Sequence, residues 1–265
     1  MPRKRLALGG MRIALLEVAM KIKTAKLGGV GLALSLFAIF PVALFAYDEI
    51  VVKNGATIRG VVKIDGRVPK LPPLQITKYK EFCQDVPNET LVVGPGQGVR
   101  YAVVTLEGIS KGKAVEQESM HELDNVKCRF IPHVQAASVG QFVLFKNSDP
   151  ILHTAHGMFT GDQPQFNVGL FPGRVSRKPL AAPGLVKIQC EVHPWMSAYI
   201  VVTDHPYHAV TDAYGEYLIN DIPAGSYRVK VWQEGLGIQE KTFEAKAGAT
   251  TKLDFALTAK PQVKK

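Results

Sequence analysis

The chain has 265 residues, which is long enough for one large domain or two modest domains with a hydrophobic core. Its 24 glycines and 17 prolines, with few long helical patterns, favour an all-β protein with many turns. The formal net charge is +9, but residues 1–46 hold seven basic residues and one acidic residue and so account for +6 of it. The rest of the chain carries only +3, which gives no support for nucleic-acid binding.

Residues 1–46 have the pattern of a secretory signal. Three lysines between Met20 and Lys26 precede an uncharged apolar stretch of 20 residues, 27–46. We expect cleavage after Ala46, which would export the remaining chain to the periplasm or the extracellular space. Met20 is then a candidate for the true start of translation. The alternative is an uncleaved anchor, because 20 apolar residues can just span a bilayer, and only this alternative attaches the chain to a membrane.

Residues 55–90 begin with a predicted strand, 56–64, followed by the turn signal Asp65-Gly66. The proline-rich stretch 68–73 is typical of an edge strand or a linker. We therefore expect residues 55–90 to form a β-hairpin and a linker. This segment is either separate or part of a small sandwich completed by the C-terminal residues.

Residues 91–203 are predicted to form a larger β-sandwich, because short apolar runs alternate with turn signals. Residues 111–126 are charged and weakly patterned, so we expect an exposed loop there, with at most a short helical turn. The predicted strands are 91–93, 101–106, 141–145, 185–189 and 198–202.

A cluster of soft metal-binding side chains lies between the last two of these strands. Cys190, His193 and Met196 have the spacing C-x-x-H-x-x-M and would share one tight loop. A thiolate with two imidazoles and a weak thioether is the ligand set of blue-copper sites, so a second histidine is needed. His153 is the better candidate and His156 the alternative ligand. Positions i and i+3 of a strand face opposite sides, so both are not expected to bind one ion.

The pattern N-x-x-x-x-x-H, followed later by C-x-x-H-x-x-M, resembles the cupredoxins, and the short ligand loop is similar to that of the amicyanin and plastocyanin type of blue-copper domain. The resemblance covers residues 91–203 and implies a Greek-key sandwich that binds one type 1 copper ion. The copper ligands that it implies are His153, Cys190, His193 and axial Met196.

The same resemblance implies roles around the site. Asn147 is expected to brace the ligand loop by hydrogen bonding, and Trp195 to help keep the site dry and offer an apolar patch to a partner. His193 would present its outer edge to the surface as the exit for electrons. No open coordination position is implied, so we expect an electron carrier and not an enzyme.

The expected partner is a redox protein such as a c-type cytochrome or a dehydrogenase. A different class of function stays open: a non-redox β-sandwich that binds or scaffolds, or a protein that handles copper. The same donors would also accept zinc or stored Cu(I).

The chain has three cysteines, and Cys190 is assigned to the metal. Cys83 and Cys128 then remain as a pair in an oxidising compartment, and we predict a disulfide between them. Two unrelated free thiols are the alternative.

Residues 204–258 predict a second, smaller module. The stretch 211–217 has the pattern T-D-A-x-G-x-Y, and 221–227 has D-I-P-A-G-S-Y, each with a turn between strand-like runs. These motifs resemble the carboxypeptidase regulatory-like modules, which implies a small transthyretin-like β-sandwich without catalytic residues. The segment is short for a complete module, so the strand at 56–64 could supply the missing part, with the cupredoxin-like domain inserted between the two.

Overall fold

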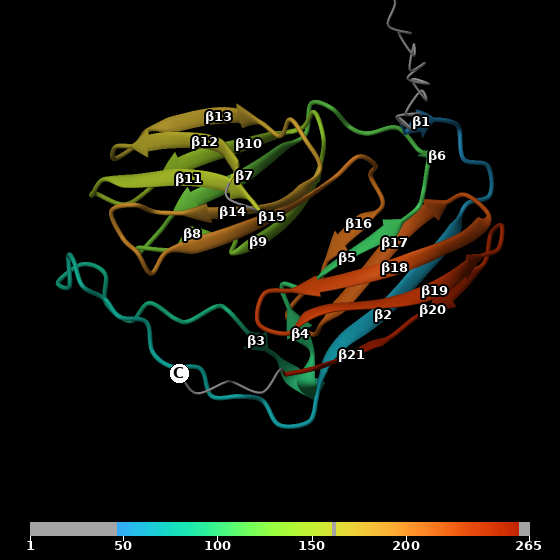
Figure 1. The fold of residues 1–265 in the computed structure, drawn as a ribbon, viewed down its shortest axis with the longest axis horizontal. Coiled ribbons are helices and arrows are strands. Elements are labelled where there is room, and N and C mark those ends of the chain that lie inside the picture. Colours follow the sequence, from blue (N-terminus) through green and yellow to red (C-terminus); the bar gives the residue numbers. More distant parts are fainter. Residues whose placement is uncertain (1–46, 161–162, 260–265) are drawn as a thin grey trace, which may run out of the picture. The chain divides into compact units, whose positions relative to one another are not determined.

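The computed structural model describes residues 47–160 and 163–259. These residues form strands almost throughout, with one 3-10 turn, η1 (Pro95–Gln97), which confirms the all-β prediction (Figure 1). The predicted signal segment, residues 1–46, lies outside the described residues. Within the described ranges, no helix has the length and apolar character needed to cross a membrane.

The larger sandwich consists of two sheets. One has the strand order β13-β10-β7-β8, and the other has the order β12-β11-β14-β15-β9. β10 runs parallel to β7 and β15 runs parallel to β9, while their other neighbours are antiparallel. The strands are β7 (Met120–Asn125), β8 (Phe130–Ile131), β9 (Val134–Ser138), β10 (Phe142–Asn147), β11 (His153–Phe159), β12 (Gln163–Leu170), β13 (Val175–Pro179), β14 (Gly184–Gln189) and β15 (Ser197–Thr203).

Alternation of buried and exposed side chains along these strands explains why the two sheets pack face to face. In β10, Val143 and Phe145 are buried and their neighbours are partly exposed. In β14, Val186 and Ile188 are likewise buried between partly exposed neighbours. These residues share one apolar core with the buried side chain of Leu123. The exposed loop expected at 111–126 is therefore wrong in part, because β7 is a central strand of its sheet. The charged and polar side chains of β7 leave no apolar alternation that would predict a strand.

The smaller sandwich is also built from two sheets. One has the order β16-β5-β18-β19, and in the other β2 lies between β17 and β20 and also pairs with β21. The strands are β2 (Ala56–Asp65), β5 (Val103–Glu107), β16 (His208–Val210), β17 (Glu216–Ile222), β18 (Gly225–Gln233), β19 (Gly237–Ala245), β20 (Thr250–Lys252) and β21 (Phe255–Thr258). Two further pairs are β1 (Asp48–Glu49) with β6 (Lys111–Gly112) and β3 (Val92–Val93) with β4 (Val99–Arg100).

The strand predicted at 56–64 is β2, and it completes the small sandwich, which is one of the two arrangements that the sequence left open. It forms no hairpin with a following strand and pairs antiparallel with β17 and parallel with β20 and β21. β5 belongs to the small sandwich and not to the larger one, because it pairs with β16 and β18. Local apolar patterns identify strands, but only the pairing of segments more than 100 residues apart decides which sheet each joins.

The two sandwiches share a small apolar cluster and a buried polar contact. The apolar cluster includes Val103, Val134 and the ring of Trp232. Beside it, the Glu234 carboxylate lies 2.7 Å from His133 Nε2 and accepts a 3.0 Å hydrogen bond from the Tyr199 hydroxyl. A carboxylate that contacts two side chains of the larger sandwich fixes the end of β18 there more specifically than apolar contact alone.

Candidate metal centre

The histidine and cysteine candidates meet at one end of the five-stranded sheet. His153 is the first residue of β11, and Cys190 follows the last residue of β14. These two strands are antiparallel, with His156 opposite Gln189, so the chain beyond β14 runs beside the start of β11. The loop 190–196 turns back into β15 and is closed by backbone hydrogen bonds from Cys190 to Met196 and from Met196 to His193.

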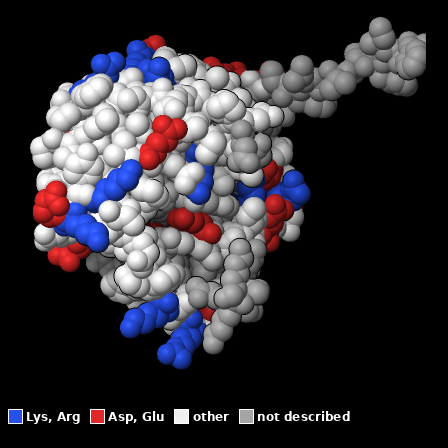
Figure 2. All heavy atoms as spheres, turned by 60° about the vertical axis from the view of Figure 1, so that its left-hand side comes forward, with Lys and Arg blue, Asp and Glu red and all other residues white. Residues whose placement is uncertain are grey.

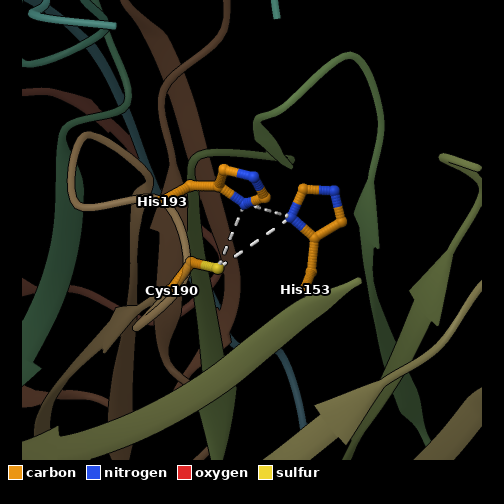
Figure 3. Close-up of side chains that lie close together, drawn as sticks. All are labelled: His153, Cys190 and His193. Carbon is orange, nitrogen blue, oxygen red and sulfur yellow. Dashed lines mark hydrogen bonds between the residues drawn. The ribbon is translucent and has the colours of Figure 1, made fainter. Parts of the chain in front are cut away.

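Three donor atoms converge in this corner (Figure 3). Nδ1 of His153 lies 3.0 Å from Nδ1 of His193, and Cys190 Sγ lies 3.9 Å and 3.6 Å from these two nitrogens. All three side chains are buried, with 0–2 % of their surface exposed. No other group of three close histidine, cysteine or carboxylate donors occurs in the described parts of the chain.

The separations fit one bound ion. Nitrogen donors lie about 2.0–2.1 Å and thiolates about 2.3 Å from a metal such as zinc. At bond angles between about 95° and 130°, those lengths put two nitrogens about 3.0–3.7 Å apart and a nitrogen and sulfur about 3.2–3.9 Å apart. The three measured distances fall within these ranges. The same two-imidazole and one-thiolate set therefore has room for an ion at its centre.

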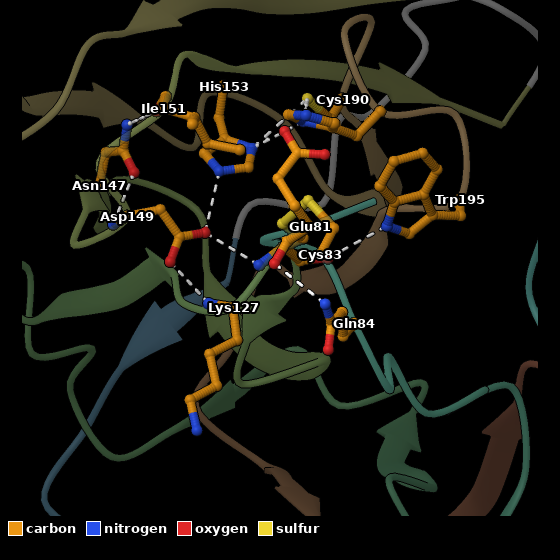
Figure 4. Close-up of a disulfide and its surroundings, with 12 residues drawn as sticks. Glu81, Cys83, Gln84, Lys127, Asn147, Asp149, Ile151, His153, Cys190 and Trp195 are labelled. Atoms are coloured by element: carbon orange, nitrogen blue, oxygen red, sulfur yellow. Dashed lines mark hydrogen bonds and ion pairs between the residues drawn. A yellow bond between two sulfur atoms is a disulfide. The ribbon is translucent and has the colours of Figure 1, made fainter. Parts of the chain in front are cut away.

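His153 is held by a carboxylate that the sequence analysis missed. Its Nε2 donates a 3.0 Å hydrogen bond to Asp149 Oδ2, which leaves Nδ1 with the lone pair that a metal needs. Asp149 also accepts hydrogen bonds from the backbone N–H groups of Lys127, at 2.6 Å, and Cys128, at 2.8 Å (Figure 4). Lys127 and Cys128 have φ values of 51° and 57°, so successive amides form an anion-binding concavity.

The charge of Asp149 is stabilised within the protein. Burial by itself would raise the pKa of this carboxyl group, but hydrogen bonds from His153, Cys128 and Lys127 outweigh burial and lower the pKa below its usual value. A carboxylate that stays ionised accepts a hydrogen bond from the imidazole and so fixes the orientation and the tautomer of that ring. The spacing of four residues between Asp149 and His153 was visible in the sequence, but nothing there showed that their side chains meet.

Cys190 is the most strongly shifted group of the site. Burial would raise the pKa of its thiol, but contacts with His153 and His193 and a 3.4 Å hydrogen bond from the Thr154 N–H lower the pKa from 9.0 to about 5. Thr154 Oγ1 in turn accepts a 2.8 Å hydrogen bond from the Glu191 N–H, which ties the ligand loop to β11. A thiolate is the form of cysteine that binds metals.

We expect the thiol of Cys190 to titrate near pH 5 in the metal-free protein, against 9.0 for an ordinary thiol. Ultraviolet thiolate absorbance, measured against a Cys190→Ala variant, reports this midpoint. Because the folded-state pKa is the lower one, ionisation stabilises the fold fully only above about pH 9, and this contribution is lost as the pH falls to about 5. A midpoint at 9 would show that the two imidazoles do not act on the sulfur.

Asn147 braces a different loop from the one expected. Its side-chain NH₂ group donates 2.8 Å hydrogen bonds to the carbonyls of Ile151 and Leu170, and its oxygen accepts one from the Asp149 N–H. These bonds fix the turn that leads into His153. Asn147 therefore holds the upstream ligand and its carboxylate in place, and not the loop 190–196.

Three other residues singled out in the sequence, His156, Met196 and Trp195, lie outside the group of three converging donors. His156 lies outside the donor group, and its Nδ1 is 2.9 Å from a carboxylate oxygen of Glu191. Met196 is buried in the core of the larger sandwich at 2 % exposure. Trp195 is partly buried, packs 5.1 Å from the His193 ring between ring centres, and donates a hydrogen bond to the Cys128 carbonyl.

The predicted disulfide is confirmed, and it lies beside the site. Cys83 and Cys128 are bonded, and both are buried. Cys128 is also the residue whose N–H binds Asp149 and whose carbonyl binds Trp195 (Figure 4). Cys190 is the free cysteine. The disulfide therefore links residues 80–85 directly to the surroundings of His153.

The expected exposure of His193 is wrong. The residue is 0 % exposed, and its Nε2 is buried without a hydrogen-bond partner among the described residues. The Tyr79 ring packs edge-on against the imidazole at 5.3 Å between ring centres. Tyr79 lies in the segment between β2 and β3, more than 100 residues away in sequence, so no local signal could have indicated this contact.

Comparison with known families gives a match in the C-terminal part of the chain. Residues 192–258 match the model of the carboxypeptidase regulatory-like domain. This range starts within the ligand loop and contains β15 of the larger sandwich, and it lacks β2 and β5, which complete the smaller one. No curated protein is significantly similar to the chain.

Similar solved structures include copper proteins. A copper-containing nitrite reductase from Thermus scotoductus SA-01 shares 28% identity over 36% of this chain, with a TM-score of 0.31, and this chain spans 24% of the reductase chain. A purple cupredoxin from Nitrosopumilus maritimus shares 19% identity over 31% of this chain and 98% of its own, with a TM-score of 0.28. A point mutant of amicyanin in the reduced state shares 18% identity over 34% of this chain and 97% of its own, with a TM-score of 0.29.

Proposed function

We propose that this chain is an exported copper protein that carries electrons by cycling one type 1 ion between Cu(I) and Cu(II). The observation that carries the proposal is the buried convergence of two Nδ1 atoms and one thiolate at separations that suit a single ion. His153, Cys190 and His193 would hold the ion, with Met196 as a weak further ligand. Copper, when bound, would supply a one-electron couple for exchange with a partner.

The surroundings of the donors support electron transfer over substrate chemistry. Two imidazoles and a thiolate bind both oxidation states of copper in one compromise geometry. Asp149 fixes one imidazole, and Thr154 and the closed loop fix the sulfur, so the ligands have little freedom to rearrange. Burial of all three donors leaves no open side from which a substrate could reach the ion. Ligands that keep their positions when the charge of the ion changes keep the reorganisation energy of electron transfer low.

The proposed location rests on the disulfide, and the proposed partner on the electron-carrying role. The disulfide between Cys83 and Cys128 supports an oxidising compartment, as expected for a protein exported to the periplasm or beyond. The proposed partner is a c-type cytochrome or a dehydrogenase. Figure 2 shows basic and acidic side chains interspersed among uncharged residues on the face that it draws, so charge there does not select a partner of one sign.

Cyclic voltammetry of the purified chain loaded with copper tests the proposal. We expect a reversible one-electron wave together with an intense thiolate-to-copper band in the visible spectrum. A protein that binds copper only as Cu(I), or zinc in preference to copper, and that shows no reversible wave would refute electron carriage. That result would support the alternative of a metal-storing or scaffolding sandwich, for which the same donor set is suitable.

A further inference from the structure

The segment 71–90 contains no strand and yet is fixed to the metal end of the larger sandwich. It leaves β2 and returns to β3, and Figure 1 shows it as the teal stretch without arrows. Its partly buried side chains Ile76, Phe82 and Val86 pack against the core that contains Cys190 and Met196. A segment of this length without regular structure inside a compact unit usually serves a function.

Two further ties hold this segment in place. Cys83 is bonded to Cys128, whose N–H group binds the carboxylate that orients His153. Glu89 lies 3.7 Å from the guanidinium group of Arg129, and both side chains are mostly buried. A small cavity of about 30 Å³ is lined by residues of the segment and by Trp195 and Met196 of the ligand loop, so the segment and the loop face each other directly.

Tyr79 lies at the point where the segment meets His193. Hydrogen bonds from the N–H groups of Phe82 and Cys83 to the Tyr79 carbonyl form a tight turn, so the disulfide and the ring are positioned together. Tyr79 has a φ of 49°, a left-handed conformation that is unfavourable for an aromatic residue. One side of its ring contacts the imidazole, while 42 % of the residue is exposed to solvent.

The imidazole of His193, which the Tyr79 ring contacts, is shielded from solvent. His193 Nε2 is fully buried and has no partner among the described residues, although leaving a buried polar atom unsatisfied is unfavourable. The rings of Tyr79 and Trp195 both pack against this imidazole, with ring centres 5.3 Å and 5.1 Å away. Tyr79 is the one of these two rings that comes from the segment 71–90.

We propose that residues 71–90 form a disulfide-pinned cover over the metal site, and that Tyr79 takes the place of an exposed imidazole as the group that a redox partner meets. The inference rests on the proposed function for its redox meaning, but the cover itself is a property of the metal-free chain. It shields His193 from solvent and from small molecules, so electron exchange is confined to partners that dock on Tyr79.

Chemical modification of the metal-free protein tests the cover without using copper. Diethyl pyrocarbonate acylates accessible imidazole nitrogens, and mass spectrometry of peptides reports each histidine separately. We expect His193 to be protected in the wild type and to react about tenfold faster in Tyr79→Ala, a factor that corresponds to about 1.4 kcal/mol of lost protection. His156, which is partly exposed, is the internal reference. Tyr214→Ala removes an exposed ring from the small sandwich and should change nothing.

A second measurement uses the copper-loaded protein. Oxidation by ferricyanide should be faster in Tyr79→Ala than in the wild type and unchanged in Tyr79→Phe, which keeps the ring. The double variant Cys83→Ser/Cys128→Ser, once its fold is verified by circular dichroism, should expose His193 in the same way.

The outcomes separate the two proposals. Equal modification of His193 in the wild type and in Tyr79→Ala would overturn the cover, whatever the colour of the protein. A protected His193 in a protein that gives no reversible copper wave would leave the shielding intact and refute electron carriage. An unchanged ferricyanide rate in a blue Tyr79→Ala protein would show that Tyr79 does not limit electron exchange at the site, which would overturn its role in the proposal.

Discussion

The variant Cys190→Ser is expected to lose the intense visible band of the copper-loaded protein completely while remaining folded. The band arises from charge transfer between a thiolate and Cu(II), and a serine hydroxyl is neither deprotonated at neutral pH nor a soft donor. Cys190 is the only free cysteine among the described residues, and it lies beside both imidazoles. The substitution is nearly isosteric, so the surrounding core should be preserved.

Absorption and electron paramagnetic resonance spectra of the two proteins measure this effect. His156→Gln provides the control, because His156 lies outside the donor group and pairs with Glu191 instead. This control should keep the band, whereas His153→Gln should lose it. A blue Cys190→Ser protein would mean that the copper is bound elsewhere, and a colourless His156→Gln protein would reverse the choice between the two histidines.

The variant Asp149→Asn is expected to weaken Cu(II) binding by about 10–100-fold, the usual effect of removing the group that orients a metal-bound histidine. It should also lower the free energy of unfolding of the metal-free protein by about 3 kcal/mol, because the N–H groups of Lys127 and Cys128 and Nε2 of His153 lose a charged acceptor. An asparagine offers one oxygen in place of two, so its NH₂ group must face a donor.

Competition with a copper chelator gives the affinity, and urea denaturation of the metal-free protein gives the stability. Asp204→Asn is the matched control, since Asp204 is 58 % exposed and lies 3.9 Å from a histidine nitrogen. A long contact of this kind, made by an exposed carboxylate, contributes about 0–1 kcal/mol, so little change is expected. If Asp149→Asn retains the affinity of the wild type, the carboxylate is a structural acceptor for the turn at Lys127 and Cys128 and does not position His153.

The kind of fold and the donors of the ligand loop could be predicted from the sequence. Turn signals and short apolar runs indicated an all-β chain, and the spacing of Cys190, His193 and Met196 indicated soft donors in a loop between two strands. These features are local, and their physical basis is local too: strand alternation has a period of two, and a loop of seven residues necessarily keeps its donors close together. Once Cys190 was assigned to the metal and export was expected, Cys83 and Cys128 remained as the predicted pair, and they are bonded.

The surroundings of the donors depend on long-range packing. β5 joins the small sandwich because it pairs with strands more than 100 residues later, and pairing between distant segments leaves no mark on its local pattern. Asp149 and Tyr79 could not be identified from the sequence for the same reason. Nothing in the local pattern shows that the Asp149 carboxylate contacts His153 or that the Tyr79 ring contacts His193, because only the fold brings these side chains together. The donors of the loop 190–196 are thus encoded locally, while their meeting with His153, their orientation and their access to solvent are encoded by the fold.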